Sequence, residues 1–432
     1  MLGESGGDAI EHGSQTPDLL TLLVELGSEM AATGQPVYVV QDRITAVARA
    51  HGAESATVTA FPTYLMVSIG RGEPAAVQLT PALGGTPRLD QIASLDHLLD
   101  DAEAGVVTPA EGLRRLAEIR AMPARWGPLH RVVGYAILAM GICLVLHPAP
   151  LEVAAAAVLG ALVGILRSAF RGQQTLQMLT PVTAAFLVSA LSAWAVQAEI
   201  SQLGLRPMVA ALVVFLPGAA LTTAVLELAA GQMISGASRL VSGGVQLALL
   251  AFGILAGIES VGISPSRVLF SDEALLGAWS PWVGVFVFAV GVVLSDSAPR
   301  RSLTGLLIVL YAAWGAQVLS NALAGGYVGA LLGATVMTMM AFIVERLPSA
   351  MPAHAAFLPG FWLLVPGALG LMGLTRFAGG GSAQDLFVTV GSLFAVALGV
   401  LFGTQLLAWA VASRRLVGRV TGTIARWRPF VG

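Results

Sequence analysis

One carboxylate in the sequence lies inside a long apolar run, where its charge could take part in transport. Glu227 stands in the run from Thr222 to Leu228. A charge at the centre of a bilayer costs about 2.5–3.5 kcal/mol on insertion scales, so such a residue usually faces a cavity or a partner. Glu227 is therefore a candidate proton carrier or substrate ligand. A position at the cytoplasmic interface, in contact with water, explains it equally well.

Other polar residues could act together with this carboxylate. Arg239 could pair with Glu227 or with a substrate carboxylate, although anchoring on the cytoplasmic side also explains it. Thr222, Thr223 and, in a later run, Asn321 could read a hydroxyl or an amide. Such residues more often satisfy the backbones of neighbouring helices, which is the alternative interpretation.

Proline–glycine pairs interrupt two of the apolar runs. A proline inside a span removes a backbone donor, and interrupted helices at matching places in two halves point to a transporter's substrate site. The residues Phe215–Gly218 of one run reappear as Phe357–Gly360 in another, which also contains a second pair. A packing kink without substrate contact is the alternative. The candidate site residues in these pairs are Pro217, Gly218, Pro359, Gly360, Pro366 and Gly367.

The composition excludes several kinds of chemistry. A single cysteine, Cys143, rules out an internal disulfide and a Cys-rich metal site. All 23 basic residues are arginine, so the chain has no lysine for a Schiff base or a P-loop. The six histidines have no metal-ligand spacing, and neither a nucleophile elbow nor a dinucleotide-binding glycine loop is present. We therefore expect no catalytic residue, metal or cofactor.

Hydropathy and charge divide the 432 residues into a soluble segment and a membrane segment. Hydrophobic residues make up 56% of the chain, and the mean hydropathy of +0.79 indicates a polytopic membrane protein. Residues 1–127 hold 8 arginines and 16 acidic residues, whereas residues 128–432 hold 15 arginines and 9 acidic residues. Neither part is basic enough to suggest a nucleic-acid partner.

The soluble segment is predicted to form a small cytoplasmic α/β domain over residues 17–127, after a disordered tail of residues 1–16. The tail lacks the basic and apolar regions of a signal peptide. Helical spacing of apolar residues predicts helices over 18–32, 37–50, 89–104 and 110–121. Short β-branched and aromatic runs predict strands over 57–61, 64–69 and 75–79.

The membrane segment is predicted to contain ten transmembrane helices in two halves of five, residues 128–260 and 275–412, followed by a basic cytoplasmic tail of residues 413–432. Each apolar run is long enough to cross the hydrocarbon core. Because five is odd, the second half begins on the opposite side, which makes the halves an inverted repeat. Among the arginines of the loops and the C-terminal tail, sixteen lie on the side of the N-terminus and three on the other, which predicts that both termini are cytoplasmic. The predicted spans are about 129–146, 151–168, 179–198, 207–229, 240–258, 277–295, 303–321, 327–344, 354–374 and 387–411.

These residues resemble the bacterial threonine/serine exporters, a family in which a cytoplasmic domain precedes about ten membrane helices. The resemblance covers about Leu19 to Ala412. Its more specific part lies in the first membrane half, where the family commonly has aspartate in place of Glu227, and in the paired Pro-Gly motif of the second half. The soluble domain departs from the family at Gln35 and Pro36. The matching residues of the first half are Pro217, Gly218, Glu227, Leu228, Gly231, Ser235, Gly236 and Arg239.

The resemblance implies export of small hydroxylated amino acids, L-threonine and L-serine, driven by the proton gradient across the bacterial cytoplasmic membrane. The expected partners are the amino acid, protons and the lipid bilayer, and a homo-oligomer stays open. Related members suggest a dicarboxylate such as succinate as an alternative substrate. Such a substrate favours a second cation, for which Arg239, Arg167 and Arg171 are the options. A membrane-tethered enzyme or a sensor that acts through residues 1–127 is a further alternative.

Overall fold

The computed structural model describes residues 7–70, 76–81, 87–171, 173–199, 204–269, 276–347, 352–364, 366–382 and 384–421. Its internal contacts divide the chain into two units. The first consists of Met1–Arg125 together with Thr223–Ser242, and the second consists of Trp126–Thr222 and Gly243–Gly432. A stretch from the predicted membrane segment therefore packs with the N-terminal residues.

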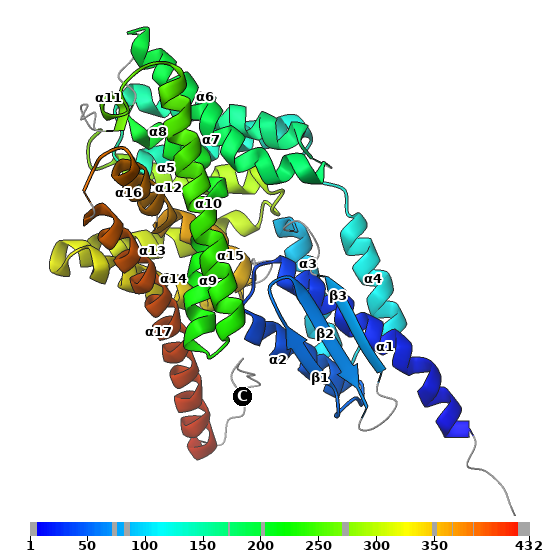
Figure 1. Cartoon of the computed structure of the whole chain (residues 1–432). Helices are drawn as coiled ribbons and strands as arrows, with labels where there is room; N and C mark the ends of the chain where they lie inside the picture. Colours follow the sequence, from blue (N-terminus) through cyan, green and yellow to red (C-terminus); the bar gives the residue numbers. More distant parts are fainter. Residues whose placement is uncertain are drawn as a thin grey trace, which may run out of the picture. The chain divides into compact units, whose positions relative to one another are not determined.

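The N-terminal part of the first unit combines four helices with one small sheet (Figure 1). The strands form an antiparallel sheet in the order β1-β2-β3. In its register Val58 pairs with Val67, and Val67 pairs with Gln78. The elements are α1 (Gly7–Ala32), α2 (Val37–Ala50), β1 (Thr57–Ala60), β2 (Tyr64–Ile69), β3 (Ala76–Pro81), α3 (Leu89–Glu103) and α4 (Pro109–Ala121).

The core of this unit joins the apolar faces of α1 and α2 to one face of the sheet. Residues three or four apart lie on the same face of a helix, so the leucines of α1 form one stripe. Leu22, Leu26 and Met30 of α1 are fully buried, as are Ile44 of α2 and Val67 of β2. All five belong to one hydrophobic cluster. Helix α1 thus holds the sheet and α2 together.

The elements of this unit lie close to their predicted positions, with a difference at the N-terminus. Helix α2 has the predicted bounds, and each strand overlaps its predicted run. Helix α1 begins at Gly7, so residues 7–16 are helical where the sequence predicts a disordered tail. Residues 1–6 and Ala75, the predicted start of the third strand, lie outside the described residues.

Arg43 of α2 is buried in this unit with three carboxylates of α3 around it. Its guanidinium lies 2.7 Å from Asp96, 2.7 Å from Asp100 and 2.5 Å from Glu103. One arginine cannot neutralise three carboxylates. Burial raises the pKa of both Asp100 and Glu103, and the negative charge of Asp96 raises them further. Arg43 is therefore the residue that holds α2 against this acidic face.

Arg43→Gln is expected to weaken the attachment of α3 to α2. Loss of the arginine leaves partly buried carboxylates without a counter-charge, at a cost of about 3 kcal/mol. Hydrogen–deuterium exchange of the full-length protein should show backbone amides of α2 and α3 exchanging about 100-fold faster. Arg49→Gln, an exposed arginine on the same helix, is the control. Equal exchange in the two variants would contradict a stabilising role for Arg43.

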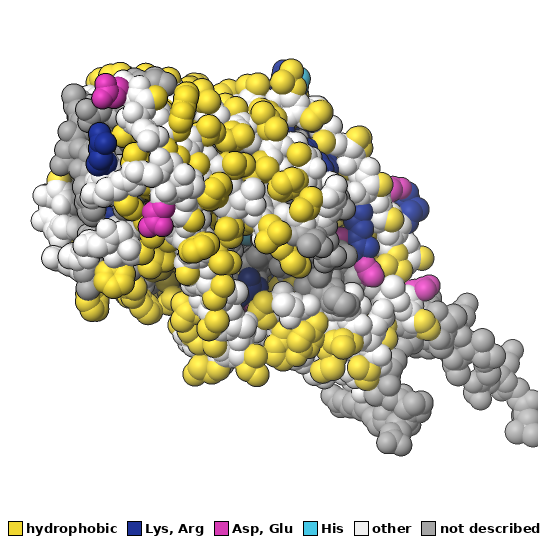
Figure 2. Space-filling model, turned by 45° about the horizontal axis from the view of Figure 1, so that its top comes forward, with side chains coloured by type: hydrophobic (Ala, Val, Ile, Leu, Met, Phe, Trp, Pro, Cys, Tyr) yellow, Lys and Arg dark blue, Asp and Glu magenta, His cyan; other side chains and the backbone are white. Residues whose placement is uncertain are grey.

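The rest of the described chain is built from apolar helices, of which residues 223–242 belong to the first unit. In the described part of the chain, seven helices are long and apolar enough to cross a membrane, or eight if the bent pair of α8–η1 and α9 is one span. Two shorter apolar helices, α12 and α15, add to these. Hydrophobic side chains cover much of the face in Figure 2, as expected for a surface in contact with lipid. The helices are α5 (Pro128–Val145), α6 (Pro150–Ala169), α7 (Gln174–Gln197), α8 (Leu205–Leu212), η1 (Val213–Phe215), α9 (Gly218–Ala229), α10 (Met233–Ser260), α11 (Ser266–Leu269), α12 (Ser280–Ser295), α13 (Ser302–Ala324), α14 (Gly326–Val344), α15 (Ala353–Leu364), α16 (Pro366–Ala378) and α17 (Gln384–Thr421).

Each of the ten predicted runs overlaps one or two of these helices. The runs 207–229 and 354–374 are each divided between two helices. Helix α17 continues to Thr421, beyond the predicted start of the basic tail at residue 413, and residues 422–432 lie outside the described part.

Helices α5 and α12 cross each other through glycines at their ends. A Cβ atom on Gly134 of α5 would lie 2.5 Å from the backbone nitrogen of Ser295. A Cβ atom on Gly284 of α12 would lie 2.9 Å from the backbone nitrogen of Val145. The start of each helix therefore lies beside the end of the other, so the two helices are antiparallel. Small residues allow the backbones to approach this closely.

Helices α5 and α12 make a second pair of reciprocal glycine contacts nearer their middle. A Cβ atom on Gly141 of α5 would overlap the backbone of Phe288 in α12. A Cβ atom on Gly291 of α12 would overlap the backbone of Leu138 in α5. In each helix the two glycines are seven residues apart, so they lie on one face.

Two further helix pairs have a common glycine spacing. Gly253 and Gly257 of α10 face the backbone of α7, and Gly399 and Gly403 of α17 face the backbone of α14. Both pairs have the small-xxx-small spacing that brings membrane helices together. Helices α7 and α10 are the third and fifth of the first predicted half, and α14 and α17 have the same places in the second.

Candidate functional site

The helix break before Pro217 is stabilised by hydrogen bonds within the second unit. The turn η1 ends at Phe215, α9 begins at Gly218, and the axes of the two segments differ by 58°. The backbone N–H of Leu221 donates to Pro217 O at 2.8 Å. The side-chain amide of Gln246, on α10, donates to Phe215 O at 2.6 Å. A carbonyl that the break leaves without a helical partner is thereby satisfied by a side chain.

In the second half, the helix continues at the proline where the repeated motif predicts a break. Helix α15 continues through Pro359 and ends at Leu364, and α16 begins at Pro366. A proline at the first helical position has no hydrogen bond to lose, whereas Pro359 costs α15 one bond without ending it. The predicted break at Pro359 is therefore wrong, and the other predicted break, at Pro366, directly follows residue 365, which lies outside the described residues. The side chains of Pro366 and Gly367 lie outside the described part.

Thr222 and Thr223 follow the first break on α9, and both are buried. Within the described residues, Thr222 Oγ1 is buried without a hydrogen-bond partner. A hydroxyl in this state can accept or donate a bond to a group that enters the protein. The division of the chain places Thr222 in the second unit and Thr223 in the first.

Glu227 and Arg239 form an ion pair inside the first unit. Glu227 lies near the end of α9, Arg239 lies near the start of α10, and Gly231 makes the turn between them at a φ of +81°. Arg239 Nε is 3.2 Å from Glu227 Oε1, and the Glu227 side chain is fully buried. Glu227 Oε2 is buried and has no hydrogen-bond partner within the described part.

The burial of Glu227 comes from the N-terminal residues that cover it. Val37 N, the first N–H of α2, donates to Glu227 Oε1 at 3.0 Å. Pro36, which precedes α2, offers no side-chain cap. The carboxylate therefore caps α2 from a distant part of the chain, at the end of the helix where the macrodipole favours negative charge. Of the two positions that the sequence left open for Glu227, the structure has the buried one, with Arg239 as partner, and not the one in contact with water.

Two more contacts join the same segments. Arg239 Nη2 donates to Gln35 O at 3.3 Å, and Gln232 Nε2 donates to Gln41 Oε1 at 3.4 Å. Burial raises the pKa of Tyr38, in the first turn of α2, and the charge of Glu227 raises it further. Tyr38 therefore stays neutral at physiological pH. The result is a contact surface between residues 35–41 and the α9–α10 turn.

Ser235 and Gly236 serve the packing of this turn. Ser235 is buried, and a Cβ atom on Gly236 would lie 2.6 Å from Leu228 Cγ. A larger residue at position 236 would push α10 away from α9 and separate Arg239 from Glu227. These two residues position the ion pair through the packing of the turn.

The other predicted site residues lie in the second unit. Asn321 is exposed on α13, and its side chain lies over Gly329 of α14. Gly360 is buried on α15, where a Cβ atom would overlap the Met337 sulfur. These residues therefore contact neighbouring helices, and their role in transport stays a prediction.

The sequence prediction missed the backbone of Gln35 and Val37 and the side chain of Gln246. Only Gln246 gave a signal, since it is an amide inside an apolar run. The second half also holds polar side-chain atoms that are buried without a partner in the described part. They include Trp314 Nε1, Gln317 Oε1, Trp362 Nε1 and Thr375 Oγ1.

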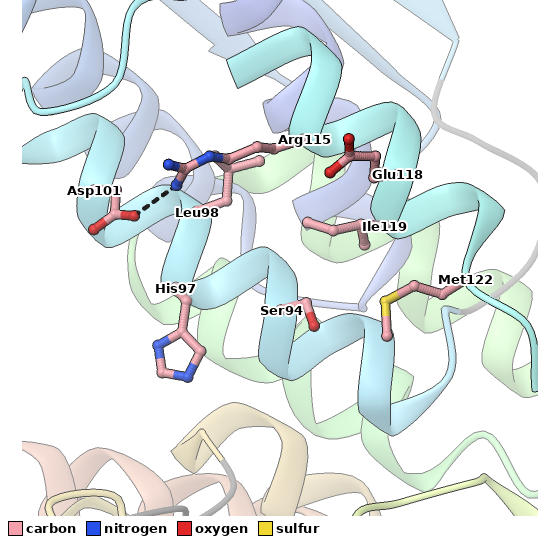
Figure 3. A pocket seen from close by; sticks show the side chains of 8 residues that line it. All are labelled: Ser94, His97, Leu98, Asp101, Arg115, Glu118, Ile119 and Met122. Carbon is pink, nitrogen blue, oxygen red and sulfur yellow. Dashed lines mark hydrogen bonds and ion pairs between the residues drawn. The ribbon is translucent and has the colours of Figure 1, made fainter. Parts of the chain in front are cut away.

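A groove of about 340 Å³ lies between α3 and α4 of the first unit (Figure 3). Arg115 pairs with Asp101 across it at 3.0 Å, and Glu118 pairs with Arg114. Figure 3 shows His97 pointing away from Arg115 and Glu118, so these groups do not converge on one point. The groove gives no support to the enzyme alternative. Its lining residues are Ser94, His97, Leu98, Asp101, Arg115, Glu118, Ile119 and Met122.

Comparison with known families gives one match. Residues 21–261 match the model of the family ThrE, described as "Putative threonine/serine exporter". The match covers more than half of the chain and includes both the break at Pro217 and the Glu227–Arg239 pair. No curated protein and no solved structure matches the chain.

Proposed function

Because the chain belongs to the threonine/serine exporter family ThrE, we propose that it exports L-threonine and L-serine across the bacterial cytoplasmic membrane, driven by the proton gradient. The observation that carries this proposal is the combination, on α9, of a helix break at its start and a buried carboxylate near its end. Broken helices form the substrate sites of many secondary transporters. A buried carboxylate can carry the coupled proton.

In this proposal Glu227 gains and loses a proton during each transport cycle. As a carboxylate it attracts Arg239 and accepts the hydrogen bond of Val37. Protonation removes the negative charge, which weakens both interactions and leaves Arg239 without its counter-ion. The α9–α10 turn and residues 35–41 would then separate more easily. A change in protonation is thereby coupled to a movement of α9.

We also propose that the ten predicted spans form two inverted halves around the α5–α12 crossing. In an inverted repeat the first helices of the two halves are antiparallel and related by a two-fold axis. The exchanged glycine contacts of α5 and α12 support this arrangement, as do the glycine pairs of α10 and α17. The arginine distribution supports cytoplasmic N- and C-termini.

Uptake of labelled L-threonine into proteoliposomes tests the proposed function. With the full-length protein and an imposed pH gradient, we expect threonine to accumulate above its equilibrium level. Excess serine should block uptake and succinate should not. Empty liposomes and a collapsed gradient are the controls.

The competitors also identify the outcome that would overturn the proposal. Flux of succinate without flux of threonine would replace the hydroxylated amino acid by a dicarboxylate as substrate. Threonine flux that is independent of the pH gradient would refute proton coupling and keep the substrate.

A further inference from the structure

Arg167, in the last turn of α6, lies against two aromatic rings of the second unit. Its guanidinium carbon is 5.1 Å from the centre of the Tyr135 ring and 5.5 Å from that of Phe215. Contacts with ring faces hold the planar guanidinium in place through cation–π attraction. The N–H groups along its edge stay available for hydrogen bonds. Phe215 is also the last residue before the break at Pro217.

Arg167 is partly exposed, whereas a second arginine of this group is buried. Arg131, in the first turn of α5, has 8% of its surface exposed. Tyr135, one helical turn later, interacts electrostatically with both Arg131 and Arg167. In the described residues, neither guanidinium makes a direct ion pair or a hydrogen bond with another side chain.

The charges around these arginines do not balance. Asp296, directly after α12, interacts electrostatically with both Arg131 and Arg167. One carboxylate against two guanidinium groups leaves an excess of one positive charge, and a third arginine, Arg171, also interacts electrostatically with Tyr135. A buried charge is costly unless a counter-ion neutralises it. One further anion would therefore neutralise the excess positive charge of this group.

We propose that Arg131 and Arg167 form a carboxylate-binding site beside the break before Pro217. The identity of the ligand rests on the proposed function: the site receives the carboxylate of the exported amino acid, and Asp296 faces its ammonium group. A guanidinium binds a carboxylate through two parallel N–H···O bonds, which gives both strength and orientation. The charges of the zwitterion then match the two arginines and the aspartate.

Binding measurements on the purified full-length protein test this site. The ligands are L-threonine, L-threoninol, which replaces the carboxylate by a hydroxymethyl group, and succinate, each titrated by calorimetry in detergent. The wild type should bind threonine and discriminate strongly against threoninol. Arg167→Gln should raise the Kd for threonine at least about tenfold and remove that discrimination, because the carboxylate loses its partner.

Two further variants separate recognition from structure. Arg167→Lys keeps the charge but loses the bidentate geometry, so we expect an intermediate Kd. Arg300→Gln is the matched control, because Arg300 also stacks on an aromatic ring, 5.0 Å from the centre of Trp126. This variant should bind threonine as the wild type does. Size-exclusion chromatography shows whether each variant is folded. If Arg167→Gln does not fold, the Kd of Arg167→Lys for threonine and the discrimination against threoninol test the site instead.

The outcomes distinguish this inference from the proposed function. Wild-type affinity and wild-type discrimination in both Arg167 variants would overturn the site and leave the exporter proposal intact. Binding of succinate alone, lost in Arg167→Gln, would keep the carboxylate site and overturn the amino-acid substrate. Failure of the folded wild type to bind any of these carboxylates would overturn both.

Discussion

Glu227→Gln is expected to abolish threonine uptake driven by a pH gradient. Glutamine has nearly the same shape but cannot change its charge, so the proton can no longer be coupled to the movement of α9. In proteoliposomes we expect the gradient-driven rate to fall at least tenfold, a loss of about 1.4 kcal/mol or more in coupling free energy. Glu227→Asp should retain gradient-driven uptake, because it keeps an ionisable group at this position.

A double variant separates coupling from stability in this experiment. Glu227→Gln leaves Arg239 buried without a counter-charge, and breaking a buried pair in this way costs about 3–5 kcal/mol. Glu227→Gln/Arg239→Gln removes both charges, so it should regain much of the thermal stability without regaining gradient-driven uptake. Glu118→Gln, at an exposed carboxylate, is the control. Uptake by Glu227→Gln at the wild-type rate under every imposed gradient would refute the coupling role.

The ion pair could be predicted from the sequence, but its surroundings could not. Glu227 and Arg239 are close in sequence and lie on two helices joined by a glycine turn, so a local argument suggests their contact. The bond from Val37 joins residues 190 positions apart. Nothing at the start of α2 signals it, because Pro36 is an ordinary residue before a helix. Tertiary contacts of this kind carry no local sequence signal.

This contact also changes what removal of the N-terminal residues would mean. Residues 35–41 supply the groups that cover Glu227, Arg239 and Gln232. Without them a carboxylate and a guanidinium would lose both their cover and two hydrogen-bond partners. A loss of transport after such a deletion would therefore follow from exposure of the ion pair, and would not require an enzymatic or sensory role of the N-terminal segment.

The second half shows a different limit of sequence reasoning. The residues Phe357–Gly360 repeat Phe215–Gly218 in type, yet α15 continues through Pro359. The same four residues therefore lie at a helix break in one half and inside a helix in the other. A proline inside a helix removes one backbone hydrogen bond, and Pro359 shows that this loss alone does not end a helix. The motif by itself cannot predict a break.

Gly141→Ala and Gly291→Ala are expected to be strongly and similarly destabilising. In each variant the new Cβ atom would overlap backbone atoms of the opposite helix, Phe288 or Leu138, which cannot move aside without separating α5 from α12. Overpacking of this kind costs about 1–3 kcal/mol, and a leucine at either position should prevent folding. The midpoint of thermal unfolding in detergent, followed by size-exclusion chromatography, measures the effect.

Gly244→Ala provides the matched control, because Gly244 lies in α10 and a Cβ atom there would meet no atom within 4 Å. Alanine favours a helix over glycine by about 1 kcal/mol, so this variant should be neutral or slightly more stable. An inverted repeat makes Gly141 and Gly291 equivalent, so their variants should differ from Gly244→Ala by the same amount. A large loss at one position with none at the other would contradict the two-fold relation, since a symmetric crossing cannot tolerate a methyl group on one side alone.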